Sequence, residues 1–232
     1  MFRNSIKSLR DVFETDVMPG AVILVAGPPG SMKSTFIYSV LSSYLENTGN
    51  YGIYMTLEQS KDSLLNHMKG LGIRVPENLY TYDYGSTREV LSDTAKNIDF
   101  ISMIEQIVQI NKERLGKSFD CLGLDSLNAL YTLSKNMPDL RIKIFHFFKM
   151  LQNNGITSFI IMELPRYGQV AQGVGNEAFL ADGIIEMSFL ELKNTTKLCM
   201  QVMKMRGVKH SRDKFVIYPE KEGLMFAREV FE

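Results

Sequence analysis

The chain has 232 residues, of which 45% are apolar, and this is ample for a single three-layer core. Lysine plus arginine and aspartate plus glutamate both number 26, so a net charge of zero argues against a bulk nucleic-acid or membrane surface, although it leaves a local basic patch open. The absence of any apolar run near the roughly 18 residues of a spanning helix, and of a signal-peptide core, excludes a membrane or exported protein. We therefore expect one cytoplasmic domain, residues 1–232.

The first predicted element is a helix over residues 4–15, because Ile6, Leu9, Val12 and Phe13 recur at helical spacing. Residues 16–20 then turn the chain into an apolar strand that begins at residue 21. We expect this helix to lie across the sheet.

A phosphate-binding loop is predicted between that strand and a helix over residues 33–46. Such a loop turns backbone N–H groups toward phosphates, a lysine reaches the terminal phosphates, and a hydroxyl holds Mg²⁺. Lys33 and Ser34 stand at the positions of that lysine and that hydroxyl. The candidate nucleotide-binding residues are Gly27, Pro28, Pro29, Gly30, Ser31, Met32, Lys33, Ser34 and Thr35.

Met32 departs from the usual pattern, which places a glycine before the lysine. A side chain there could crowd the β-phosphate or require a backbone angle that only glycine adopts cheaply. An ordinary glycine and proline turn between a buried strand and a helix stays open as the alternative.

The next segments alternate strand and helix. Strands are predicted over residues 51–57, 79–84, 119–124 and 156–162, and helices over 61–71, 100–115, from 127 onward and over 139–153, with a polar, turn-rich segment at 85–98. Cys121 and Cys199 lie inside apolar runs and predict buried thiols rather than a disulfide or metal ligands. This order predicts a doubly wound parallel sheet with helices on both faces.

Three acidic residues follow predicted strands, where open α/β sheets place their chemistry. Asp125 is a candidate outer metal ligand on the strand beside the phosphate loop, or else a cap for the helix that follows. Glu58 follows the second strand, and it is otherwise an acid at a helix start. Glu163 ends the strand at 156–162 and is the substitute base if Glu58 is not the base.

The C-terminal part changes pattern. Residues 164–175 predict a surface loop, and strands at 184–192, 198–205, 214–218 and 224–227 form antiparallel hairpins that extend one edge of the sheet. The predicted fold class is therefore α/β, a three-layer P-loop domain with a mostly parallel central sheet and C-terminal antiparallel hairpins.

Five segments in order make the whole chain resemble a KaiC-like ATPase domain of the RecA superfamily, as a single-domain member. They are residues 27–35, 54–60, 122–127, 177–185 and 204–210, of which the last, Lys-Met-Arg-Gly-Val-Lys-His, is the most distinctive. The resemblance implies ATP and Mg²⁺ as ligands and a homo-oligomer, a hexameric ring with ATP between subunits. It also implies that Lys204, Arg206 and His210 reach the phosphates held by a neighbouring subunit; without it, they are a solvated strand end and a loop histidine.

The resemblance further implies that Glu58 polarises the attacking water. Many members carry two adjacent glutamates there, whereas this chain has Gln59, which cannot accept a proton.

Three functions compete on this basis. The favoured one is a Mg²⁺-dependent ATPase that acts as a ring-shaped regulatory or signalling switch with an unidentified protein partner. The second is a nucleotide-binding protein with negligible hydrolysis, motivated by Met32 and Gln59. The third is a recombination mediator that binds DNA through residues 164–175, but the neutral charge and the single basic residue Arg166 in that loop count against nucleic acid as a partner.

Overall fold

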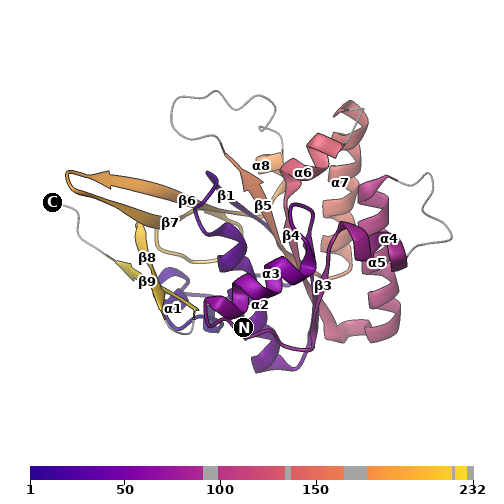
Figure 1. Ribbon diagram of the computed structural model, residues 1–232, viewed down its shortest axis with the longest axis horizontal. Helices are drawn as coiled ribbons and strands as arrows, with labels where there is room; N and C mark the ends of the chain where they lie inside the picture. Colours follow the sequence, from indigo (N-terminus) through magenta and orange to yellow (C-terminus); the bar gives the residue numbers. More distant parts are fainter. Residues whose placement is uncertain (91–98, 134–136, 165–176, 221–222, 229–232) are drawn as a thin grey trace.

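The computed structural model describes residues 1–90, 99–133, 137–164, 177–220 and 223–228, in which nine strands form one sheet. Their bounds are β1 (Val22–Gly27), β2 (Tyr51–Thr56), β3 (Leu79–Tyr82), β4 (Phe119–Asp125), β5 (Thr157–Glu163), β6 (Gly183–Leu192), β7 (Thr195–Met205), β8 (Phe215–Glu220) and β9 (Gly223–Arg228). The strand order is β3-β2-β4-β5-β1-β6-β7-β8-β9, parallel from β3 to β6 and antiparallel from β6 to β9. The predicted α/β fold with C-terminal antiparallel strands is confirmed (Figure 1).

Helices cover both faces of the sheet (Figure 1). One face carries the N-terminal turns and two helices, and the other carries the remaining helices. The first set is η1 (Phe2–Asn4), α1 (Leu9–Val12), α2 (Lys33–Thr48) and α3 (Lys61–Gly70); the second is α4 (Tyr84–Val90), α5 (Phe100–Leu115) with η3 (Gly116–Ser118), α6 (Leu127–Leu133), α7 (Met137–Asn153) and α8 (Glu177–Leu180). None of the described helices has both the length and the apolar composition that crossing a membrane requires.

The two halves of the core follow from the period of the central strand. In β1, Ile23 and Val25 pack into the cluster under α2, whereas Val22, Leu24 and Ala26 pack into the cluster under α5 and α7. Successive side chains of a strand point to opposite faces, so a strand that is apolar throughout serves both layers. Cys121 and Cys199 are buried thiols that form no disulfide with each other, as predicted.

The N-terminal helix predicted over residues 4–15 is wrong in extent. Only η1 and α1 are helical, because Phe13 leaves the helix with φ −114° and ψ 116° and forms an antiparallel bridge with His210. Further contacts fix this segment to the C-terminal strands: the Ser8 hydroxyl accepts a hydrogen bond from the Phe226 N–H at 2.9 Å, and the Thr15 hydroxyl accepts one from the Lys209 N–H at 3.0 Å. Long-range pairing thus overrides the local helical pattern.

A second correction concerns the segment predicted to be polar and turn-rich at 85–98. Helix α4 occupies Tyr84–Val90, and its first turn is fixed by Asp83, whose Oδ1 accepts a hydrogen bond from the Ser86 N–H at 2.8 Å. The other oxygen of Asp83 accepts one from the Lys61 N–H at 2.8 Å, at the start of α3. One carboxylate therefore satisfies helix-start N–H groups of two helices, which the sequence pattern did not reveal.

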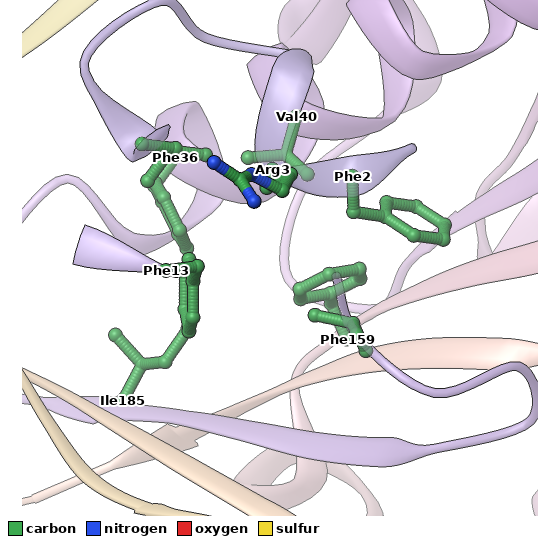
Figure 2. A pocket seen from close by; sticks show the side chains of 9 residues that line it. Phe2, Arg3, Phe13, Phe36, Val40, Phe159 and Ile185 are labelled. Atoms are coloured by element: carbon green, nitrogen blue, oxygen red, sulfur yellow. The ribbon is translucent and has the colours of Figure 1, made fainter. Parts of the chain in front are cut away.

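A small apolar cavity lies beneath the N-terminal segment and is bordered by Arg3 (Figure 2). Its volume of about 10 Å³ is enough for about one water molecule. The Arg3 Nε atom is buried and makes no hydrogen bond within the described chain. This cavity is far too small for a nucleotide. The residues that line the cavity are Phe2, Arg3, Leu9, Phe13, Val17, Phe36, Val40, Phe159 and Ile185.

Candidate nucleotide site

The loop predicted to bind phosphate, called the phosphate loop below, links the end of β1 to the first turn of α2, which agrees with the predicted order of strand, loop and helix. Gly27 is required by close packing, because a Cβ atom there would lie 2.2 Å from the carbonyl oxygen of Met187 on β6. Gly30 has a φ of +81°, which glycine adopts without steric cost. The first N–H groups of α2 have no acceptor inside the helix, so together with the helix dipole they provide an anion site at this end of the loop.

Met32 occupies the N-cap of α2 with φ 62° and ψ 26°. Among the described residues it is the one non-glycine residue in the left-handed region. The concern that this position requires a glycine-like angle is therefore confirmed, and the strain amounts to roughly 1–2 kcal/mol. The half-buried side chain packs against the core cluster under α2, and this contact offsets part of the strain.

Lys33 is the buried cation of the site, and its side chain is 5% exposed. Its Nζ donates to the carbonyl oxygen of Pro28 at 2.8 Å and lies 3.5 Å from Oε1 of Glu163. Burial lowers the pKa of Lys33, and the charge of Glu163 opposes that shift. Ser31 also donates to the Pro28 carbonyl through its hydroxyl, at 2.7 Å, which closes the loop around the lysine.

Ser34 and Asp125, the predicted metal ligands, lie next to each other. Asp125 is 3% exposed and accepts a hydrogen bond from the Tyr54 hydroxyl at 3.1 Å. Burial raises the pKa of Asp125, and the nearby Ser34 hydroxyl opposes that shift. A hydroxyl and a carboxylate are ligands of the kind Mg²⁺ accepts directly or through water. The described residues hold no cluster of three His, Cys, Asp or Glu side chains, so phosphate oxygens and water would supply the other ligands of a Mg²⁺ ion bound here.

Glu58 lies in the segment between β2 and α3, where its carboxylate accepts a hydrogen bond from the Ser126 hydroxyl. Helix α3 begins later, with Ser60 as its N-cap, so Glu58 is not the helix-start acid that the alternative reading required. The Ser126 hydroxyl also accepts a hydrogen bond from the Ala129 N–H at 3.3 Å. It is thus Ser126, rather than Asp125, that caps the helix after β4.

The topology corrects the expected position of Asp125. Strand β4 is not beside the phosphate-loop strand, because β5 lies between β4 and β1. The residue next to the loop is therefore Glu163, which pairs in register with Gly27. Along the carboxyl edge of the sheet, Glu58, Asp125 and Glu163 follow one another toward Lys33, and all three charges act on that lysine.

Lys204 and Arg206 lie near the amino-terminal end of β1, whereas the phosphate loop follows its carboxyl end. The Arg206 N–H donates to the carbonyl oxygen of Asp182, whose side chain accepts from the N–H of Val22 at the start of β1. The phosphate loop begins at Gly27, five residues farther along that strand and about 16 Å away at the usual rise of a strand. Within one chain these residues do not meet the site.

The two basic side chains differ in their contacts. The Lys204 ammonium donates to the carbonyl oxygens of Ala178 at 3.0 Å and Ala181 at 2.6 Å, at the end of α8. Burial lowers the pKa of Lys204, and the nearby Arg206 charge adds to this shift. Arg206 is 58% exposed and lies 3.5 Å from Oδ1 of Asp182. Its guanidinium is therefore the more accessible of the two cations.

His210 lies farther along the same segment. Its Nδ1 is 2.9 Å from the Ser211 carbonyl oxygen, and its backbone is bridged to Phe13. The backbone of His210 is thus held by the N-terminal segment, whereas Lys204 and Arg206 contact residues 178–182.

The comparison with known families decides the family of this chain. The model of a family described as "ATPase: KaiC" matches residues 2–229. The chain belongs to the KaiC ATPase family. The computed fold agrees with a crystal structure of a KaiC-like protein from Pyrococcus horikoshii, at a TM-score of 0.78 and 21% identity, covering 96% of both chains.

KaiC-family relatives differ in length from this chain. The circadian clock oscillator protein KaiC of Prochlorococcus marinus is 23% identical over 225 residues, which cover 94% of this chain and 44% of that protein. This chain therefore spans less than half the length of that relative. A UPF0273 protein of Aeropyrum pernix is 25% identical, and the alignment covers 94% of each chain.

Several residues of this KaiC-family site were missed by the sequence reasoning. Asn128 on α6 accepts a hydrogen bond from the Glu163 N–H at 2.7 Å and donates to the Glu163 carbonyl oxygen at 3.3 Å. Tyr131 on the same helix donates to Glu177, a carboxylate that is 2% exposed. Ser126 had a local signal, since a serine after a strand and before an apolar helix is a typical cap. Asn128 and Tyr131 had none, because their partners are distant in sequence.

Proposed function

We propose that this KaiC-family chain is a Mg²⁺-dependent ATPase that works as a hexameric ring with ATP between subunits, in a regulatory or signalling role. The observation that carries the proposal is the carboxyl edge of the sheet, where the buried Lys33 in a glycine-shaped loop lies beside three strand-end carboxylates. The loop and the start of α2 suit the phosphates of ATP. Mg²⁺ held near Ser34 and Asp125 would neutralise charge on the phosphate oxygens.

Glu58 is the proposed general base. Its carboxylate is oriented by the Ser126 hydroxyl, which leaves the second oxygen to accept a proton from a water that attacks the terminal phosphate. The neighbouring Gln59 is turned toward α3, where its side-chain oxygen accepts a hydrogen bond from the Ser63 hydroxyl at 3.3 Å. A second carboxylate at position 59 is thus not required by this arrangement.

The separation of Arg206 from the phosphate loop of its own chain supports a ring. The charge that develops on the terminal phosphate in the transition state requires a cation besides Lys33. Arg206 is exposed, but it lies at the opposite edge of the parallel strands from the phosphate loop of its own chain. A head-to-tail ring would bring the Arg206 of one subunit to the phosphate loop of the next. We assign Arg206 this role in trans, with Lys204 and His210 beside it.

A first experiment tests assembly and turnover together. Size-exclusion chromatography with light scattering, with and without Mg-ATP, should give a hexamer in the presence of nucleotide, and phosphate release should require Mg²⁺. A protein that remains monomeric at every nucleotide concentration would refute the ring. An oligomer that binds Mg-ATP without releasing phosphate would favour the alternative of a nucleotide-binding regulator, which the strained Met32 motivates.

Mixed rings test the role of Arg206. Arg206→Ala and Glu58→Gln should each abolish turnover but retain ATP binding, whereas the matched control Arg212→Ala, at an exposed arginine six residues farther along the chain, should remain active. An equal mixture should recover about a quarter of wild-type turnover, because random assembly pairs an intact Glu58 with an intact Arg206 at that fraction of interfaces. No recovery in co-assembled rings would show that both residues serve the same subunit.

The recombination-mediator alternative has no support from the described structure. The loop predicted to bind DNA, residues 164–175 with Arg166, lies outside the described residues except for its first position. Binding of single-stranded DNA with a steep salt dependence would be the observation that revives it.

A further inference from the structure

The ion pair between Lys33 and Glu163 joins the phosphate loop to the neighbouring strand. The ammonium and the carboxylate are 3.5 Å apart, and Glu163 keeps 32% of its side chain exposed. The second acceptor of the lysine is the Pro28 carbonyl oxygen at 2.8 Å. The ammonium that is expected to contact nucleotide phosphates is therefore held by acceptors of its own chain.

The backbone of Glu163 is held in place by several hydrogen bonds. Its backbone N–H and carbonyl groups are both bonded to the Asn128 side chain, and its strand pairs with β1 at Gly27. The next residue, Leu164, donates its N–H to the Gly27 carbonyl oxygen at 3.0 Å. Because this backbone is fixed, the Glu163 carboxylate loses little conformational freedom when it forms the ion pair with Lys33.

The other two carboxylates near Lys33 are held by different groups. Asp125 accepts a hydrogen bond from the Tyr54 hydroxyl, and Glu58 accepts one from the Ser126 hydroxyl. Glu163 has the largest electrostatic influence of the three on the lysine. Among the described carboxylates, it is the one in direct contact with Lys33.

We propose that Glu163 competes with the nucleotide phosphates for Lys33 and thereby sets the nucleotide affinity of the site. The inference rests on the proposed function, since it requires that Lys33 bind phosphate. Binding must break the ion pair and leave the carboxylate next to phosphate oxygens of the same sign. A neutral side chain of the same shape removes both costs.

The first test measures affinity. Glu163→Gln should lower the Kd for Mg-ADP and Mg-ATP by roughly two- to fivefold in titration calorimetry, the range expected for a partly exposed ion pair. Glu58→Gln is the matched control, because it removes the same charge near the site from a residue that contacts Ser126 instead. Equal gains in the two variants would show a general charge effect and overturn direct competition.

The second test needs no nucleotide. The Glu163 carboxylate lies 3.5 Å from the Lys33 ammonium and covers part of it, so Glu163→Gln should increase the rate of acetylation at Lys33 by acetic anhydride, read by mass spectrometry. Acetylation of the exposed Lys69 should stay the same. Unchanged labelling at Lys33 would mean that the ion pair is not formed in solution.

The two tests separate this inference from the proposed function. If wild-type protein binds nucleotide and Glu163→Gln has the same Kd, competition is refuted while the nucleotide site stands. If labelling changes but neither protein binds nucleotide, the proposed function fails and the competition fails with it, whereas the ion pair remains.

Discussion

Replacement of Gly27 by alanine tests the close approach of β1 and β6 that shapes the phosphate loop. The new Cβ would lie 2.2 Å from the Met187 carbonyl oxygen and 2.9 Å from the Ser31 hydroxyl. Since carbon and oxygen approach to about 3.3 Å at closest in such contacts, the two strands must separate by about 1 Å. The Met187 carbonyl group belongs to the backbone, so it cannot rotate away from the new Cβ as a side chain could.

The magnitude follows from what that separation disrupts. Overpacking alone costs about 1–3 kcal/mol, and weakening one or two ladder hydrogen bonds adds about 0.5–1.5 kcal/mol each. We expect Gly27→Ala to lose about 2–4 kcal/mol of unfolding free energy, or roughly 5–15 °C in Tm for a chain of this size. Nucleotide affinity should fall as well, because Gly27 ends the strand that presents the loop.

Differential scanning fluorimetry and denaturant unfolding measure the effect, and Gly70→Ala provides the control. Gly70 ends α3 with nothing within 4 Å of its would-be Cβ, so alanine there should leave the stability unchanged or raise it by up to about 1 kcal/mol. If Gly27→Ala is as stable as Gly70→Ala, then the two strands are not packed as closely as described, and the steric reasoning is wrong.

Three further predictions address other groups. Lys33→Ala should abolish Mg-ATP binding in calorimetry without changing the circular dichroism spectrum, and unchanged affinity would contradict the assignment of the phosphate loop. Met32→Gly should keep or tighten nucleotide binding, because it relieves the left-handed strain; a large loss of affinity would show that the loop depends on the methionine side chain. Asp83→Ala should lose about 1–2 kcal/mol at pH 7 in urea unfolding, because two helix-start N–H groups lose their acceptor. Hydrogen bonds from the Lys61 and Ser86 N–H groups lower the pKa of Asp83, so its contribution is complete above the unfolded pKa and is lost as the pH falls below about 4. A difference between wild type and Asp83→Ala that stays constant from pH 7 to pH 3 would contradict this account.

Much of the sheet could be predicted from the sequence because the strands are local apolar runs with clear ends. The phosphate loop was predictable for the same reason, since glycine, lysine and serine positions are fixed by spacing within one short segment. The hairpins at the C-terminal edge also carry their signal locally, in two strands joined by a short turn.

The arrangement of the site was harder to predict because it depends on strand order. Nothing local indicates that β5 enters between β4 and β1, and this insertion is what places Glu163, rather than Asp125, beside Gly27. The contact between Glu58 and Ser126 joins residues 68 positions apart. The prediction of the N-terminal helix was wrong for the same reason, since Phe13 leaves the helical pattern and pairs with the distant residue His210.

The attachment of the N-terminal segment to the last strands has a consequence for synthesis on the ribosome. The bond between Ser8 and Phe226 spans 218 residues, and that between Thr15 and Lys209 spans 194. Leu9, Val12 and Phe13 are buried in the folded protein, yet the segments that pair with this stretch follow it by 194 to 218 residues in the chain. During most of translation this apolar stretch is without its final partners. We therefore expect chaperones to bind it and slow elongation to favour its aggregation.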